Sequence, residues 1–234
     1  MNSFLATAFW LVQEASPTLG GGQELHLGEI WDSGGFMMWP LGFCMAVGFL
    51  IIIWKFIDLQ VKSTRTRALL SDVDEMVAHG RLREALSRCE DSKAPAAAIL
   101  EAGLKRHEEG TERVIQAIEN AGAIQIAELE KGLVWLATLA NVAPLLGFLG
   151  TVIGMIQAFQ AIEIAGEVEA TLVAGGIKVA LITTATGLAI AIPINIAHNY
   201  FVTRVDRLVI DMEESAQKMI DALHEQEAAA RAAS

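Results

Sequence analysis

Threonine side chains within long uncharged stretches are the residues most able to do chemistry in this sequence. Thr151 lies in a run without Asp, Glu, Lys, Arg or His from 132 to 162, and Thr183 and Thr184 lie in a later apolar stretch. A threonine in a membrane helix usually bonds to a carbonyl of its own helix, so packing is one interpretation of each. Because two successive stretches carry threonine near the middle beside Gly or Ala, we favour a polar pathway lined by Thr151 and Thr184, with Thr183 as a further candidate.

Other polar residues near these threonines have less specific positions. Asn141 and Asn195 either line the inner half of such a pathway or cap packed helices. Lys178 either reaches toward the membrane interface or biases ion entry as a charge at the pore mouth. His198 is interpreted as an interfacial residue in preference to a proton relay.

Small residues and prolines accompany the threonines in both stretches. Small side chains let neighbouring membrane helices approach closely, so these positions predict tight helix packing. The predicted packing positions are Gly147, Gly150, Gly154, Pro144, Gly187 and Pro193.

The composition indicates a protein that is partly in a membrane and partly exposed to water. Its 234 residues are 53% hydrophobic, and the mean hydropathy is +0.42. We predict an all-α, polytopic membrane protein with three transmembrane helices, two of them extended into the cytoplasm, and a small cytoplasmic helical bundle. The predicted parts are a periplasmic segment 1–35, transmembrane helix 36–57, a cytoplasmic helical domain 58–130, transmembrane helix 131–163, a periplasmic loop 164–172, transmembrane helix 173–200, and a cytoplasmic C-terminal helix 201–234.

Helical patterns continue beyond two of the spans. From Thr111 apolar residues recur three or four apart into the second span, which predicts one unbroken helix. After the third span, apolar residues from Val202 follow a heptad pattern. Pro95 is predicted to start an amphipathic helix that closes at Gly110. The first 33 residues are interpreted as a short periplasmic surface helix, with a cleaved or atypical signal peptide as the alternative.

Charges flanking the spans predict the orientation. Lys55, Lys62 and Lys131 lie at one side of the predicted membrane, whereas Glu163 and Glu167 lie at the other. Since lysine and arginine are retained in the cytoplasm, the N-terminus is expected outside and the C-terminus inside. Trp39, Trp54, Trp135 and Tyr200 are expected at the membrane interfaces.

Several functional classes are disfavoured. The net charge of −11 argues against a nucleic-acid partner. Cys44 and Cys89 lie in different predicted compartments, so we expect no disulfide. We find no metal, cofactor or nucleotide motif and no catalytic set, and expect a protein that is not an enzyme. No Asp or Glu lies in the middle of any span, so a partner would have to supply a carboxylate able to carry a proton.

Several segments resemble the ExbB/TolQ/MotA family of ion-driven motor channels, most closely ExbB. They are MMWPL before a span ending IIIWKF, GRLREALSRCEDSKAPAAAIL, LATLANVAPLLGFLGTVIGMIQAF and GGIKVALITTATGLAIAIP. Three spans favour the ExbB/TolQ branch over the four-span MotA branch. The resemblance implies a pentamer in the bacterial inner membrane that encloses the single spans of ExbD- or TolR-like partners. A partner aspartate would carry protons, and the movement would reach a TonB- or TolA-like protein.

By motif, Thr151 and Thr184 match the family's pore threonines, whose hydroxyls would face the partner carboxylate. The family's usual glutamate five residues before the second threonine is replaced by Val179, which follows Lys178. This departure leaves the ion and its path open. The leading hypothesis is a proton-channel motor subunit, whether ExbB-like or TolQ-like. The competing one is a non-conducting oligomeric scaffold in the lipid bilayer, and a membrane-embedded enzyme is the weakest.

Overall fold

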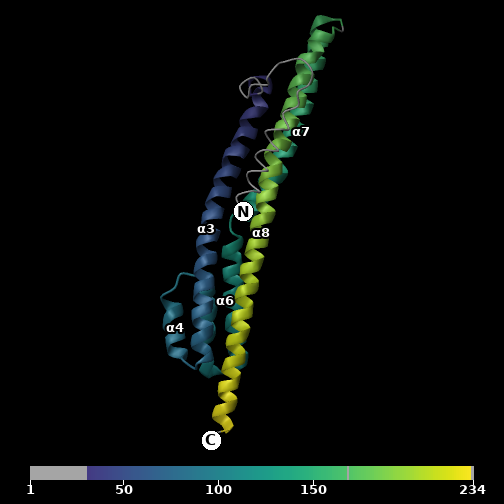
Figure 1. The fold of residues 1–234 in the computed structure, drawn as a ribbon. Coiled ribbons are helices and arrows are strands. Elements are labelled where there is room, and N and C mark those ends of the chain that lie inside the picture. Colours follow the sequence, from purple (N-terminus) through teal and green to yellow (C-terminus); the bar gives the residue numbers. More distant parts are fainter. Residues whose placement is uncertain (1–30, 168, 233–234) are drawn as a thin grey trace.

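The computed structural model describes residues 31–167 and 169–232 of an elongated helical molecule (Figure 1). In chain order the elements are η1 (Gly35–Met37), α3 (Met38–Ala78), α4 (Leu82–Glu90), α5 (Pro95–Leu104), η2 (His107–Glu109), α6 (Thr111–Glu130), α7 (Leu133–Ala165) and α8 (Ala170–Ala232). No strand occurs among the described residues, and the predicted all-α class is confirmed. The predictions for the N-terminal segment fall largely on residues 1–30, which lie outside the described part.

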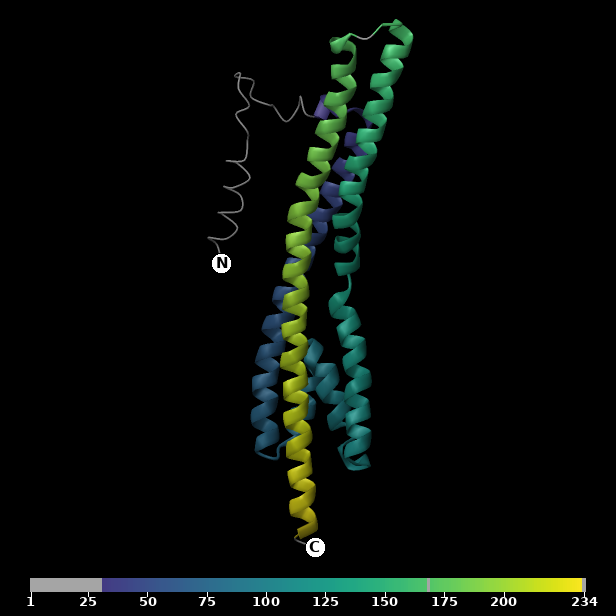
Figure 2. The ribbon, with the colours of Figure 1, turned by 90° about the vertical axis from the view of Figure 1, so that its right-hand side faces the viewer.

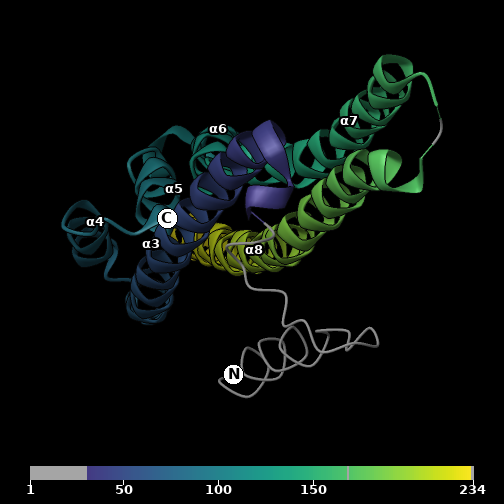
Figure 3. The ribbon, with the colours of Figure 1, turned by 90° about the horizontal axis from the view of Figure 1, so that it is seen from above.

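Three helical regions are long and apolar enough to cross a membrane. They are Gly35–Ala78, Thr111–Ala165 and Val173–Ala222, with mean hydropathies of 2.2, 1.9 and 1.9 over their most apolar windows. α7 and α8 run antiparallel and are joined at one tip of the molecule, and α3 lies beside them (Figures 1 and 3). The three predicted spans are therefore present in α3, α7 and α8.

The prediction of one unbroken helix from Thr111 into the second span is wrong. α6 ends at Glu130 and α7 begins at Leu133, so two residues separate them. Lys131 is extended (φ −53°, ψ 126°), and Gly132 has a left-handed backbone with φ of +93°. A three-to-four spacing shows which face is apolar, but it does not require the backbone to be continuous along that face.

One other helix end differs from the sequence prediction, and α3 extends beyond its predicted span. The range 36–57 gives the predicted membrane span, and α3 continues past it as one helix of 41 residues to Ala78. α5 is shorter than the helix predicted to close at Gly110, because it ends at Leu104 and a short 3-10 turn follows. Extension beyond the membrane level is thus found for the first span as well as for the third.

The half of the molecule that is predicted to be cytoplasmic contains a core of large apolar side chains. α3, α5, α6 and α8 pack around it, and α4 lies against α3 and α5 (Figure 2). Buried members from these helices include Leu69, Val73, Val77, Ala85, Leu100, Leu104, Met212, Ala216 and Met219. The small helical bundle predicted here is therefore confirmed.

Above this bundle, many large apolar side chains point outward, as expected for contact with lipid or other membrane helices. They include Phe43, Phe49, Leu145, Phe148, Phe159, Leu181 and Ile192. Trp39, Trp54, Trp135 and Tyr200 are also exposed, as expected for interfacial residues. Cys44 and Cys89 are both free and buried.

Candidate functional site

Small residues form the contact between α7 and α8. The buried residues of α7 at this contact are Ala143, Gly147, Gly150, Gly154 and Ala158, and those of α8 are Gly176, Ala180, Thr183, Gly187 and Ala191. On each helix they follow one another three or four residues apart, which places them on one face. We call these two faces together the glycine seam.

The seam brings the two backbones into direct contact. A Cβ atom added at Gly154 would lie 2.6 Å from the carbonyl oxygen of Gly176, and one at Gly187 would lie 2.7 Å from that of Ala143. At Gly147 the added atom would lie 3.0 Å from the carbonyl oxygen of Thr183. The separations at Gly154 and Gly187 leave no room for a side chain, so these two positions require glycine for a steric reason, and at Gly147 the backbone of α8 would have to shift slightly.

Thr183 is the fully buried hydroxyl of the seam. Its Oγ1 lies 2.9 Å from the carbonyl oxygen of Val179 and 3.0 Å from that of Ala180, so it donates to its own helix. Its side chain packs directly against Gly150 of α7. This is the usual arrangement of a packed membrane threonine, and a pathway role for Thr183 stays a prediction.

Thr184 is half-buried and bridges the two helices. Its Oγ1 lies 3.2 Å from the carbonyl oxygen of Gly147 on α7 and equally far from that of Ala180 on α8. One hydroxyl proton serves either acceptor, while the oxygen keeps lone pairs that can accept a further hydrogen bond. The Thr184 side chain thus contacts α7 while part of it remains exposed.

Thr151 lies at nearly the same height on α7. Its neighbour Gly150 contacts Thr183, which precedes Thr184 on the antiparallel helix. Thr151 is half-buried, and its Oγ1 donates to the carbonyl oxygen of Phe148 at 2.6 Å. Since Thr184 contacts Gly147, four residues before Thr151, the two predicted pathway threonines lie within about one helical turn of each other along the α7–α8 contact.

The remaining predicted residues lie away from this level. Asn141 is exposed and donates to the Ala137 carbonyl at 2.9 Å, and Asn195 is exposed and accepts from Asn199 at 3.1 Å. Lys178 is exposed and lies eight residues after the start of α8. Both asparagines bond within their own helices, so their predicted roles on the pathway stay predictions.

Each of the two helices contains one proline within its span. Pro144 lies inside α7 and Pro193 inside α8. A proline lacks the amide proton that would bond to the carbonyl four residues earlier, so each leaves one backbone acceptor free. At Pro144 the affected turn is adjacent to the seam residues Ala143 and Gly147.

Lys55 of α3 is a residue whose role the sequence did not reveal. Sequence reasoning used it only as a positive flanking charge, yet its side chain is 1% exposed. The available signal was its place within IIIWKF, where it ends an otherwise uncharged stretch. Its ammonium group contacts the connection between α6 and α7, as described below.

Titratable groups outside the spans show no clustered site. Within the described residues, no group of three or more His, Cys, Asp or Glu side chains could hold a metal ion. Asp74 accepts from Ser215 at 3.4 Å and lies 3.7 Å from Lys218, and partial burial raises the pKa of its carboxyl. These groups join α3 to α8 in the bundle.

Comparison with known proteins bears on this arrangement. Residues 91–214 match the sequence model of the MotA/TolQ/ExbB proton channel family. This stretch contains all of α7, α8 up to residue 214 and every residue of the glycine seam, and it covers more than half of the chain. The chain belongs to the MotA/TolQ/ExbB proton channel family.

Individual members of the MotA/TolQ/ExbB family are also similar to the chain. An ExbB homolog for biopolymer transport from Methanothermobacter thermautotrophicus is 32% identical over 192 residues, which cover 82% of this chain and 68% of that protein. TolQ of the Tol-Pal system from Haemophilus influenzae is 38% identical over 117 residues, half of each chain. The biopolymer transport protein ExbB from Aquifex aeolicus is 41% identical over 86 residues, which cover 37% of this chain and 58% of that protein. These relatives support the predicted resemblance to ExbB, and the chain is a membrane protein of this channel family.

Proposed function

We propose that this chain is the channel-forming subunit of an inner-membrane motor driven by the proton motive force. An ExbD- or TolR-like partner would supply the membrane aspartate, and the work would be done on a periplasmic TonB- or TolA-like protein. The observation that carries the proposal is the pairing of Thr151 and Thr184 at one level of two apolar helices that contain no mid-span carboxylate. The N-terminus would be periplasmic and the C-terminus cytoplasmic.

The threonine hydroxyls would serve the partner carboxylate. Both hydroxyl protons bond to backbone carbonyls of this chain, so each oxygen retains lone pairs that can act as acceptors. A protonated carboxylic acid can donate to such an acceptor, and water can bridge to it once the proton has left. The site would thereby accommodate a neutral and a charged partner without exposing charge to lipid.

Oligomer formation is part of the proposal. The outward faces of α7 and α8 carry large apolar side chains, including Leu145, Phe148 and Leu181. Copies of the chain could bury these faces against one another around the partner helix, and the family resemblance suggests five copies. The chain itself would perform no covalent chemistry and bind no cofactor.

Thr184→Val tests the proton pathway, because valine keeps the shape of threonine and removes its hydroxyl. The chain and a candidate partner would be reconstituted in proteoliposomes, and proton flux would be measured with a pH-sensitive dye. Loss of one hydrogen bond between neutral groups, worth about 0.5–1.5 kcal/mol, predicts a fall of about 2- to 13-fold. A partner without its membrane aspartate should abolish the flux.

Thr203→Val is the matched control, because Thr203 also lies on α8 and donates to its own helix, at 3.0 Å to Asn199. It lies outside the predicted span, and we expect its flux to equal that of the unmodified chain. If the Thr184→Val complex assembles and conducts like this control, the proposed pathway is refuted. Flux absent from a correctly assembled unmodified complex would favour the scaffold hypothesis.

A further inference from the structure

The connection between α6 and α7 leaves backbone carbonyls without helical partners. In one continuous helix, the Leu129 carbonyl would accept from the Leu133 amide, and the Lys131 carbonyl would accept from the Trp135 amide. The break at Lys131 and Gly132 removes both bonds. Carbonyl groups left unpaired near the membrane interface would be costly.

Lys55 of α3 bonds to both of these carbonyls. Its Nζ donates to the Leu129 oxygen at 2.7 Å and to the Lys131 oxygen at 2.9 Å. The Asp58 carboxylate lies 4.0 Å from the same nitrogen, and the Trp54 ring centroid lies 5.8 Å from it. The buried ammonium thus has acceptors on the connection and a counter-charge on its own helix.

Trp54 supports the other side of the same connection. A Cβ atom added at Gly132 would lie 3.0 Å from the Trp54 ring, and the φ of +93° is unfavourable for any residue with a side chain. Two adjacent residues of α3 therefore hold the break, one through hydrogen bonds and one through packing. We call Trp54, Lys55 and residues 129–132 the joint.

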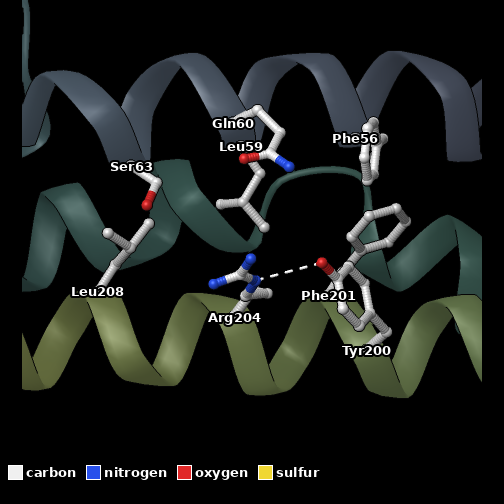
Figure 4. Close-up of a pocket in the computed structure, with 8 residues that line it drawn as sticks. All are labelled: Phe56, Leu59, Gln60, Ser63, Tyr200, Phe201, Arg204 and Leu208. Carbon is white, nitrogen blue, oxygen red and sulfur yellow. Dashed lines mark hydrogen bonds between the residues drawn. The ribbon is translucent and has the colours of Figure 1, made fainter. Parts of the chain in front are cut away.

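α8 packs against α3 next to the joint. Leu59 of α3 and Phe201 of α8 are both buried at this level, and Phe56 lies next to them (Figure 4). Arg204 donates to the Tyr200 hydroxyl at 3.2 Å on the same side of α8. The helix that carries Lys55 is thus fixed against the continuous helix of the hairpin.

The apolar stripe that runs from α6 into α7 makes a continuous helix the competing conformation. Lys55 occupies the acceptors that this helix would need, and a positive charge at the C-terminal end of α6 also interacts favourably with that helix's dipole. Without the ammonium, the amides of Leu133 and Trp135 are the nearest donors in sequence for the same carbonyls. The broken and continuous forms would direct α7 differently from the bundle.

We infer that Lys55 is a positioning residue that keeps α6 and α7 separate and so sets the direction in which α7 enters the membrane. This structural role of Lys55 does not depend on which ion the chain conducts, or on whether it conducts one. A second part rests on the proposed function. Gly147 and Thr151 lie on α7, so their positions depend on the direction of that helix, and proton flux therefore requires the broken form.

The backbone of Gly132 gives a direct test. Lys–Gly occurs once in the sequence, so carbonyl-labelled lysine with labelled glycine selects the Gly132 signal in solid-state NMR of the full chain in lipid. The unmodified chain should show a left-handed glycine, and Lys55→Met should show a helical one. A signal that stays left-handed in Lys55→Met overturns the inference.

Lys62→Met is the matched control, since Lys62 lies on α3 and pairs with Asp58 at 3.2 Å without contacting the connection. It should keep the left-handed signal and a flux within about twofold of the unmodified complex. Lys55→Met should lower partner-dependent flux at least about tenfold, because small displacements of positioned groups are costly. A helical Gly132 with full flux would overturn the functional half alone.

The two proposals fail in different ways. If the unmodified complex conducts no protons, the proposed function fails, while the Gly132 signal still decides the role of Lys55. If Lys55→Met does not accumulate in membranes, Gly132→Ala tests the joint with Lys55 in place, since alanine disfavours the left-handed backbone. Gly132→Ala should also lower the flux, and full flux would overturn the requirement for the broken form.

Discussion

The membrane-spanning half of this chain and its helical bundle hold their helices together in opposite ways. The glycine seam brings the α7 and α8 backbones together at Gly147, Gly154 and Gly187 with almost no side chain between them. The bundle instead separates its helices with large buried side chains such as Leu100 and Met212. The same helix, α8, takes part in both arrangements.

The surroundings explain the difference. In water, burial of apolar side chains drives association at roughly 25 cal/mol per Å², so large residues stabilise the bundle. In lipid this drive is absent, and association depends on close contact and interhelical hydrogen bonds. The Thr184 bond to Gly147 is possible only because the seam residues are small. Close packing therefore also brings the hydroxyls of the candidate site to the α7–α8 contact.

Gly150→Leu should have the largest effect, because it disrupts the packing of α7 against α8 in the membrane-spanning half. The added side chain would occupy the position of Thr183, so α7 and α8 could not close. We expect loss of monodisperse protein in size-exclusion chromatography after detergent extraction. Gly175→Leu is the control on α8, because no atom lies within 4 Å of an added Cβ there. Normal recovery of Gly150→Leu would show that the seam does not hold the pair.

Leu100→Ala should have the next largest effect and acts on the helical bundle. Leu100 is 1% exposed within the bundle, and truncating such a residue costs about 2–5 kcal/mol. Hydrogen exchange of α5 amides should accelerate by at least about 30-fold, the equivalent of 2 kcal/mol. Exchange in the part of α7 from Gly150 onward should not change, since the buried core that contains Leu100 reaches α7 only up to Leu146. Equal acceleration in both helices would contradict the separation of the two regions.

The smallest effect concerns pH and Cys89. Burial, with a further contribution from the Glu101 charge, raises the pKa of the Cys89 thiol from 9.0 to about 11. Because the folded pKa is the higher one, the stabilisation is complete below pH 9 and is lost as pH rises through 11. The loss would reach at most about 3 kcal/mol.

Thermal unfolding followed by circular dichroism from pH 8 to pH 11 measures this effect. The unmodified chain should lose more stability over that range than Cys89→Ala, which has no thiol to ionise at this position. If stability falls equally with pH in both proteins, ionisation of Cys89 does not contribute to the pH dependence of folding.

The sequence predicted those features of the fold that depend on local residue patterns. Uncharged length predicted three spans, and the spacing of Gly147, Gly150 and Gly154 predicted one small-residue face. These two features follow from residues close together in the chain. The antiparallel order of the last two spans further predicted that Thr151 and Thr184 would lie at similar heights.

The break between α6 and α7 could not be predicted in the same way. Its local sequence continues the apolar stripe, and glycine occurs inside helices elsewhere in the chain, as at Gly147. The bonds that stabilise the break come from Lys55, which is 74 residues from Leu129. The partner of Thr183 in the seam was also unpredictable, because pattern alone does not fix which residues of two helices meet.

α8 extends without interruption over 63 residues, which at 1.5 Å per residue makes a shaft of about 95 Å. Its neighbour in the hairpin is divided at Gly132. A push or twist applied to α8 at the membrane is therefore transmitted along its backbone to the bundle, whereas along α7 it reaches α6 only through the contacts that Trp54 and Lys55 make at the joint. The two helices of the hairpin thus connect the membrane to the bundle differently, one through a continuous backbone and the other through side chains of α3.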